Sequence, residues 1–251
     1  DGLALLGDVF ARQGLYGEAL DRSREALRLE PDLRRAMIGE AWCLVRLERA
    51  AEALPLAERL RTLEPENVEV LMLTATASAE SGDPGGALSV LDVARRVAPM
   101  RADIQQKIGD IARSLGDNES AISAYRHALE LDQDFAIVRF QLAKLLQAKG
   151  LIREAEQELV AALDAVPTYA EATLELATLR RRQGRPAEAL ESLIELLHGD
   201  PYHFDGLIAL GETLLALGRR RDAVHAFARV LRFDPTHVGA LFNEGALLSE
   251  Q

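Results

Sequence analysis

The sequence predicts an all-α fold in which a hairpin of two helices recurs along the whole chain. Three columns of residues with a period of 34 indicate this repeat. The first column is Pro31, Pro65, Pro99, Gln133, Pro167, Pro201 and Pro235. The second is Ala19, Ala53, Ala87, Ala121, Ala155, Ala189 and Ala223, and the third is Gly14, Glu48, Gly82, Gly116, Gly150, Gly184 and Gly218. No insertion or deletion interrupts this register.

The last complete repeat shows why each unit is a helical hairpin. Apolar residues recur there at the three-to-four spacing that places side chains on one helical face, in two runs: Leu207, Leu210, Leu214 and Leu217, then Ala223, Phe227 and Val230. Gly218 separates the runs, and Pro235 ends the second because proline cannot continue a helix. Such a hairpin has more apolar surface than it can bury alone, so it must stack on a neighbour.

The repeats define the expected domain organisation. They span about 1–33, 34–67, 68–101, 102–135, 136–169, 170–203 and 204–237, followed by a partial repeat at 238–251. Because there is no linker or break in composition, we expect one elongated domain whose core runs through the stacked hairpins. The chain does not begin with methionine, and its eighth repeat stops after one helix, so we expect a fragment of a larger protein.

The second repeat is the irregular one. Glu48 replaces the turn glycine, and a non-glycine residue with positive φ at that point costs on the order of 1 kcal/mol. Pro55 lies in the second turn of the second helix, where we expect a kink or a delayed start. Trp42, the only tryptophan, belongs to the first helix of the same repeat.

Helix ends in other repeats have recognisable residues. Pro84 and Pro186 follow a turn glycine and are expected to open the second helix of their repeats. Asp117 or Asn118 can cap the corresponding helix of the fourth repeat. In that repeat Gln133 replaces the terminal proline, so we expect the last helical turn to run on toward the next repeat.

These motifs resemble the tetratricopeptide repeat (TPR) family over essentially the whole chain. The family pattern is W-x2-L-G-x2-Y, then A-x3-F, then P. The last complete repeat gives Leu207-x2-Leu210-Gly211-x2-Leu214, Ala223-x3-Phe227 and Pro235. The resemblance implies a right-handed superhelical α-solenoid, with the first (A) helix of each repeat lining a concave groove and the second (B) helix forming the convex back. It implies a binding architecture rather than a chemistry.

Composition narrows the partner classes. The formal net charge of -11 argues against a nucleic-acid surface, and it disfavours anionic membranes. No apolar run approaches the ~18 residues of a membrane span. Cys43, the only cysteine, is expected to be a small buried hydrophobic residue. Arginine greatly outnumbers lysine, as in GC-rich bacterial genomes. We therefore expect a bacterial protein of the cytoplasm, with the periplasm as the alternative.

The sequence contains no pattern that indicates catalysis, a metal or another cofactor. The five histidines are scattered over B helices and loops, and only His203 and His237, one repeat apart, are expected to lie near each other. Two histidines without a carboxylate or thiol partner make a poor metal site. The glycines are turn glycines at a fixed period and not a phosphate-binding loop. We therefore expect no enzyme activity.

The resemblance also places residues two, five, nine and twelve of each A helix on the concave side. The partner-binding candidates among them are Arg35, Ile38, Trp42, Met72, Thr76, Gln106, Asp110, Arg113, Phe140, Lys144, Gln147, Thr178 and Arg181. Within the family that this chain resembles, the carboxylate clamp has lysine at place five, and the O-GlcNAc-transferase arm has a ladder of asparagines at place six. Neither pattern is present, since place five holds no lysine and place six a single asparagine, Asn243.

Three functional hypotheses remain from the sequence. The first is a non-catalytic scaffold that binds a partner segment in its groove, with Trp42, Met72 and Phe140 as apolar anchors and with Arg113, Lys144 and Arg181 giving orientation. The second is a substrate-recruiting or regulatory arm of a larger enzyme, such as a glycosyltransferase-like protein. The third is a self-assembling scaffold, because the eighth repeat presents an apolar face that another copy, or the missing second helix of that repeat, would cover. This face is made by Leu241, Phe242, Leu247 and Leu248.

Overall fold

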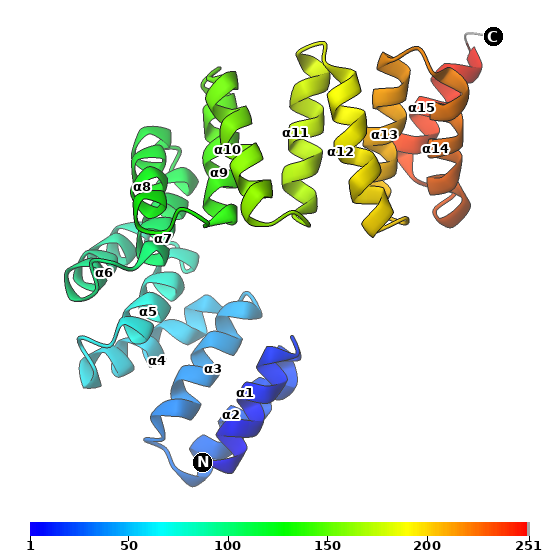
Figure 1. The fold of residues 1–251 in the computed structure, drawn as a ribbon. Coiled ribbons are helices and arrows are strands. Elements are labelled where there is room, and N and C mark those ends of the chain that lie inside the picture. The colour runs from blue at the N-terminus through cyan, green and yellow to red at the C-terminus, as the bar shows by residue number, and fades with distance from the viewer. Residues whose placement is uncertain (250–251) are drawn as a thin grey trace. The chain divides into compact units, whose positions relative to one another are not determined.

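The computed structural model describes residues 1–249, apart from the side chains of Glu244 and of residues 246–249. Over the described residues the chain forms fifteen α-helices and no strand (Figure 1). The A helices are α1 (Gly2–Arg12), α3 (Arg34–Arg46), α5 (Val68–Glu80), α7 (Ala102–Ser114), α9 (Ala136–Ala148), α11 (Ala170–Arg182), α13 (Phe204–Ala216) and α15 (Val238–Ser249). The B helices are α2 (Tyr16–Leu29), α4 (Ala50–Leu63), α6 (Pro84–Val97), α8 (Asn118–Leu131), α10 (Ile152–Ala165), α12 (Pro186–Gly199) and α14 (Arg220–Phe233). The predicted all-α hairpin architecture is confirmed.

The helices group into two compact units, an N-terminal unit of Asp1–Leu131 and a C-terminal unit that begins at Asp132. In the N-terminal unit, Met37, Leu44, Leu60 and Leu73 belong to one buried cluster that joins α3, α4 and α5. The C-terminal unit has its own clusters, one of which surrounds the fully buried Phe227. Each unit therefore has a core of stacked hairpins, while the expected single domain remains a prediction.

The turns between the helices of each hairpin follow the glycine column. All six of its glycines have positive φ, between 74° and 90°: Gly14, Gly82, Gly116, Gly150, Gly184 and Gly218. Glu48 has φ of 60° and is the one non-glycine residue with positive φ among the described residues. The predicted left-handed turn at Glu48 is confirmed, and the strain of its Cβ is present in the folded state.

Close helix crossings within two hairpins combine a glycine with an aromatic ring. Gly109 of α7 faces Tyr125 of α8, and Gly211 of α13 faces Phe227 of α14; both rings are fully buried. The equivalent positions of two other hairpins hold alanine and leucine, and each pair shares a buried cluster: Ala75 with Leu91, and Ala177 with Leu193. In these four hairpins, glycine on the A helix is matched by an aromatic ring on the B helix, and alanine by leucine.

Most predicted helix ends are confirmed, and two predictions at helix ends are wrong. Pro84 and Pro186 begin α6 and α12, and Asp117 Oδ1 accepts a hydrogen bond from Ser120 N at 3.1 Å. However, α8 does not run on toward Gln133, because Asp132 Oδ1 accepts from Asp134 N at 3.1 Å and forms a turn without proline. Pro55 does not delay α4, which begins at Ala50 in the regular repeat position, so the delayed start is wrong and the alternative, a kink, stays a prediction.

Cys43 is a buried core residue, as predicted. Its side chain lies among the residues that join α3 to its neighbours and is 2% exposed. Burial, together with the nearby carboxylates of Asp8 and Glu40, raises the pKa of the Cys43 thiol to about 11. The thiol is therefore neutral at physiological pH and packs as a small apolar group.

Candidate functional site

The strongest candidate site is a pair of adjoining pockets on the A helices of the N-terminal unit. The first, of about 780 Å³ and here called the Tyr16 pocket, is lined by Asp8, Ala11, Arg12, Tyr16, Arg35, Ile38, Gly39, Trp42, Cys43, Arg46 and Glu69. The second, of about 680 Å³ and here called the Met72 pocket, is lined by Trp42, Val45, Arg46, Glu48, Ala50, Met72, Thr76, Glu80, Asp103, Gln106, Lys107 and Asp110. Trp42 and Arg46 line both and form the wall between them.

Helical periodicity explains how the sequence builds these pockets. On α3, Ile38 and Trp42 are four residues apart and share a face with Arg46. On α5, Met72 and Glu80 lie two turns apart on the corresponding face. The opposite face of α3, which includes Met37 and Leu44, is buried against α4. Trp42 itself packs partly against this core and remains half-buried, so its indole is held in place while one part lines the pockets.

Several charged groups of the pockets are already partnered. Arg35 Nε donates to Asp8 Oδ2 at 2.8 Å, and Arg101 Nε donates to Asp103 Oδ1 at 3.0 Å. The Tyr125 hydroxyl donates to Asp110 Oδ1 at 2.7 Å from its buried position behind α7. Burial first, and then the hydrogen bond to Asp110, raise the pKa of Tyr125 far above its usual range. The phenol therefore remains a donor and holds the carboxylate of Asp110 at the edge of the Met72 pocket.

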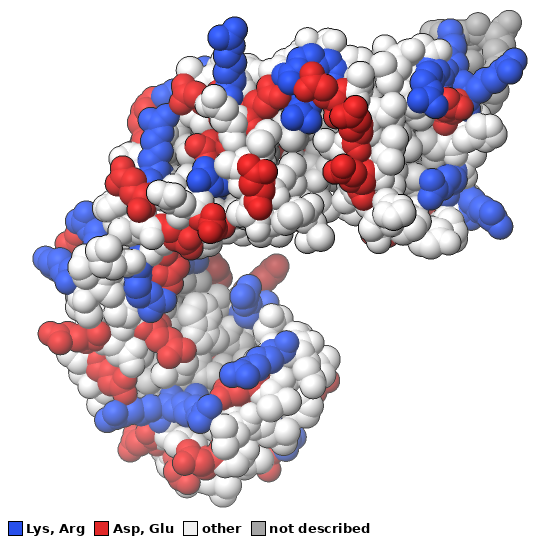
Figure 2. All heavy atoms as spheres, in the orientation of Figure 1, with Lys and Arg blue, Asp and Glu red and all other residues white. Residues whose placement is uncertain are grey.

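Other charged side chains at the pockets have no ion-pair partner among the described residues. These are Arg12, Arg46, Glu48, Glu69, Glu80 and Lys107. Such groups are available to a bound partner without first breaking an internal pair. On the face shown in Figure 2, acidic and basic side chains are intermixed over each unit. Recognition by charge must therefore come from small local groups of side chains.

The structure places seven of the thirteen predicted groove residues at these two pockets: Arg35, Ile38, Trp42, Met72, Thr76, Gln106 and Asp110. Thr76 is only 4% exposed. Its hydroxyl donates at 2.8 Å to the carbonyl of Met72, one turn earlier on α5. Its side chain forms part of the pocket floor. Arg113 is exposed on α7, lies outside both pockets, and interacts with the Tyr125 hydroxyl.

The other five predicted residues belong to the C-terminal unit and are engaged largely within it. The Phe140 ring packs against the Tyr169 ring with centroids 5.3 Å apart, and Lys144 Nζ lies 5.5 Å from the Phe140 centroid. Arg181 Nη2 donates to Glu212 Oε2 at 2.6 Å. Gln147 is half-buried, and its Nε2 atom is buried without a hydrogen-bond partner among the described residues. Thr178 is half-buried on α11. These contacts reduce the freedom of Lys144 and Arg181 to orient a ligand.

Sequence reasoning missed several residues that line the pockets. Asp8 and Ala11 occupy places nine and twelve of the first repeat, so the same rule of places would have found them. Arg46 and Glu80 lie one residue beyond place twelve, where the last turn of each A helix still faces the pocket. Tyr16 comes from the first residue of a B helix, and no place on an A helix could indicate it.

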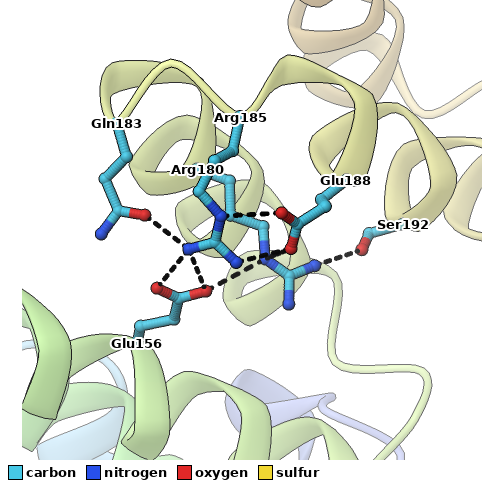
Figure 3. A network of polar contacts seen from close by, with 6 residues as sticks. All are labelled: Glu156, Arg180, Gln183, Arg185, Glu188 and Ser192. Atoms are coloured by element: carbon cyan, nitrogen blue, oxygen red, sulfur yellow. Dashed lines mark hydrogen bonds and ion pairs between the residues drawn. The ribbon is translucent and has the colours of Figure 1, made fainter.

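An extended network of charged side chains lies elsewhere, in the C-terminal unit (Figure 3). Arg185 Nη1 donates to both carboxylate oxygens of Glu156, at 2.9 and 2.8 Å, and Arg185 Nε donates to Glu188 Oε1 at 2.7 Å. Arg180 Nε donates to Glu156 Oε1 at 3.3 Å. Burial opposes ionisation of Glu156, but the hydrogen bonds from both arginines outweigh it and lower its pKa. The network joins α10 to α11 and α12, and its groups satisfy one another.

Histidines and carboxylates do not gather into a metal-binding cluster in the described part of the chain. His203 and His237 each cap a helix, and their expected proximity stays a prediction. His203 Nδ1 accepts from Gly206 N at 3.1 Å, and His237 Nδ1 accepts from Ala240 N at 3.2 Å. None of the helices formed by residues 1–249 is both long enough and apolar enough to cross a membrane.

Comparison with known families decides what kind of chain this is. A tetratricopeptide repeat model matches residues 4–68, 44–100 and 140–203, which together exceed half of the chain. The chain belongs to the tetratricopeptide repeat family. A second tetratricopeptide repeat model matches residues 180–241, and a TPR repeat model matches residues 109–150. TPR proteins are general scaffolds for protein–protein interaction.

Two curated proteins are similar to parts of this TPR chain. The DnaJ homolog subfamily C member 3 of Gallus gallus is 27% identical in an alignment of 175 residues that covers 61% of this chain and 35% of that protein. The cellulose synthase operon protein C of Pseudomonas fluorescens (strain SBW25) is 28% identical over 152 residues, 57% of this chain and 12% of that protein. The chain thus spans well under two thirds of the length of either relative.

Solved TPR structures share the fold. A thermophilic TPR protein of Thermus thermophilus has a TM-score of 0.62 and 25% identity, and the match covers 71% of this chain and 97% of that one. The C-terminal part of a TPR repeat-containing protein from Cytophaga hutchinsonii has a TM-score of 0.71 and 18% identity, covering 96% and 98%. YrrB, described as a TPR protein with an unusual peptide-binding site, has a TM-score of 0.62 and 18% identity, covering 75% and 97%. The predicted fold class, an α-solenoid of TPR hairpins, is confirmed.

Proposed function

We propose that this TPR chain is a non-catalytic scaffold that binds a segment of a partner protein on the A-helix face of its N-terminal unit. The segment lies across Trp42 and places side chains in the Tyr16 and Met72 pockets. The observation that carries the proposal is the position of Trp42, which is held by the core and forms the wall shared by two pockets of about 780 and 680 Å³.

The composition of the pockets supports a protein ligand. Ile38 in the Tyr16 pocket and Met72 in the Met72 pocket supply an apolar floor on each side of Trp42, and tryptophan is among the residues that contribute most at protein interfaces. Charged side chains without partners surround that floor, as at the polar rim of an interface. The pockets adjoin each other along the A helices, so consecutive side chains of one extended or helical segment fill both.

The single tryptophan provides a direct test. Peptides selected from a displayed library of random dodecapeptides against the purified chain are titrated into it while Trp42 emission is recorded. We expect binding to shift the emission and Met72→Ala to weaken binding about tenfold or more, because truncation of a central apolar anchor costs more than about 1.4 kcal/mol.

Met100→Ala is the matched control for this test. Met100 is 77% exposed between α6 and α7 and lines neither pocket, so its truncation leaves the affinity unchanged. Circular dichroism establishes that both variants remain helical. If Met72→Ala and Met100→Ala bind every selected peptide as the natural chain does, the pockets are not the binding site.

A specific observation favours self-association as a second candidate function. On α15, Val238, Leu241 and Phe242 are 79%, 47% and 75% exposed, an apolar surface that a second copy would cover. The side chains of Leu247 and Leu248, which the sequence also assigned to this face, lie outside the described residues. Light scattering over a range of concentrations tests the idea, and Phe242→Glu is expected to abolish a concentration-dependent increase in mass.

A further inference from the structure

We propose that the Met72 pocket accepts a lysine or arginine side chain of the partner segment. This inference rests on the proposed function and specifies the chemistry of the ligand. The sequence suggested that cationic residues of this chain orient the bound segment. At the Met72 pocket, by contrast, the charged side chains are mainly acidic. Four carboxylates and two cations line it: Glu48, Glu80, Asp103 and Asp110, with Arg46 and Lys107.

The carboxylates differ in their availability to a ligand. Asp103 is paired with Arg101, so its charge is already balanced. Asp110 accepts one hydrogen bond from the Tyr125 hydroxyl, which leaves its second oxygen for a ligand and fixes its position from behind. Glu48 and Glu80 have no ion-pair partner among the described residues. Three carboxylates therefore remain for two cations, an excess that a bound cation offsets.

The apolar part of the pocket fits the stem of the same side chain. Lysine and arginine have long aliphatic stems that pack on apolar surface while the charged head stays near water. Trp42, Val45 and Met72 provide such a surface. Tryptophan is also the aromatic ring that attracts a cation most strongly through its face. A neutral apolar side chain uses only the floor, and an acidic one meets the excess of carboxylates.

The neighbouring pocket gives the segment a direction. The Tyr16 pocket is lined by three arginines and two carboxylates, and one of these carboxylates, Asp8, is paired with Arg35. Arg12 and Arg46 have no ion-pair partner among the described residues, and they outnumber the one unpaired carboxylate, that of Glu69. The available charge of that pocket is therefore net positive and disfavours a cationic side chain. The basic residue of the segment is therefore placed on the Met72 side of Trp42 and not on the Tyr16 side.

Charge reversal in the intact chain tests the inference. Dodecapeptides that bind the natural chain and lose affinity on Met72→Ala are sequenced, and we expect them to be enriched in lysine or arginine. For one such synthetic peptide, Glu80→Lys should weaken binding about tenfold and Glu80→Gln less, since the first adds repulsion while the second only removes attraction. Replacing the basic peptide residue by norleucine should weaken binding to the natural chain but strengthen binding to the Glu80→Lys variant, because the neutral side chain removes the repulsion.

Glu66→Lys is the matched control, because Glu66 is exposed in the same unit and lines neither pocket. This substitution changes the net charge by the same amount as Glu80→Lys. It should leave the affinity within about twofold. Peptides that depend on Met72 but show no basic enrichment, or that bind equally after Glu80→Lys, overturn the inference and leave the proposed function standing. If no selected peptide depends on Met72, both the proposed function and the inference fail.

Discussion

The ring of Tyr125 occupies the space that a side chain at Gly109 would need. A Cβ atom at Gly109 would lie 2.5 Å from Tyr125 Cε1, far inside van der Waals contact. The ring is fully buried between α7 and α8, so it cannot swing into solvent. The hydroxyl at its far end donates to Asp110, which further fixes the ring. Glycine at position 109 is thus required by packing, although glycine lowers the helix propensity of α7.

Gly109→Ala is expected to lower the free energy of unfolding by about 1–3 kcal/mol, because an overpacked core must displace the ring. The double variant Gly109→Ala with Tyr125→Leu should recover part of the loss, since it recreates the combination of Ala75 with Leu91. Urea denaturation measures both. Gly17→Ala is the control, because a Cβ at that helical glycine meets nothing within 4 Å. Equal effects at positions 17 and 109 would contradict the packing argument.

Glu48→Gly is expected to stabilise the chain by about 1 kcal/mol, because Glu48 is the residue with φ of 60° in a column otherwise made of glycine. The converse substitution, Gly82→Ala at φ of 90°, should destabilise by a similar amount. Both are read from the midpoint of urea unfolding followed by circular dichroism. A Glu48→Gly variant less stable than the natural chain would mean that interactions of the Glu48 side chain outweigh the strain.

Gln105→Leu is expected to raise stability by about 1–3 kcal/mol, the cost of a buried polar group without a hydrogen-bond partner. Gln105 is 4% exposed, and its Nε2 atom has no partner among the described residues. Leu71, one repeat earlier, fills the equivalent position and is fully buried. Gln106→Leu, at the half-buried neighbour, should change stability little. A loss of stability in Gln105→Leu would show that this amide is satisfied in solution.

Glu156→Gln is expected to lower the unfolding midpoint at neutral pH and to lose this effect progressively as the pH falls into the acidic range. The pKa of Glu156 is lower in the folded state than its unfolded value of about 4.3. Its carboxylate therefore adds stability above the unfolded pKa, and this contribution disappears as the pH falls through the depressed folded pKa. Glu195→Gln, at an exposed glutamate of the same unit, should show no such dependence. Thermal unfolding at several pH values measures both, and a pH-independent difference would exclude linkage to Glu156.

How far the sequence predicted the fold is clear from individual positions. The 34-residue columns set the hairpins, and the backbone at Glu48 followed from the glycine it replaces. The prediction that α8 runs on toward the next repeat was wrong. It relied on the absence of proline at position 133, whereas the side chain of Asp132 ends the helix by forming a local turn. The buried, unpartnered amide of Gln105 could not be predicted, because its column holds Arg139 and Thr173 as well as apolar residues such as Leu71, so a polar residue there is not unusual.

The candidate site was less predictable than the fold. The positions of Trp42 and Met72 within their A helices predicted that both side chains face the same side, and both line the Met72 pocket. Helical spacing alone is enough for this prediction. The pairing of Arg181 with Glu212, 31 residues away, depends on how neighbouring repeats bring two long side chains together, and periodicity does not contain that information. The same holds for Tyr16, which reaches the first pocket from a B helix.

The complementary sizes at the helix crossings constrain how such an array can be recombined. A hairpin transplanted whole carries its own matched pair, whether Gly211 with Phe227 or Ala177 with Leu193. A chimera that joins the first helix of an alanine–leucine hairpin to the second helix of a glycine–aromatic hairpin inherits a steric collision, and the reverse combination leaves a void. Gene rearrangements that cut between hairpins should therefore yield folded descendants far more often than those that cut at the turn inside one.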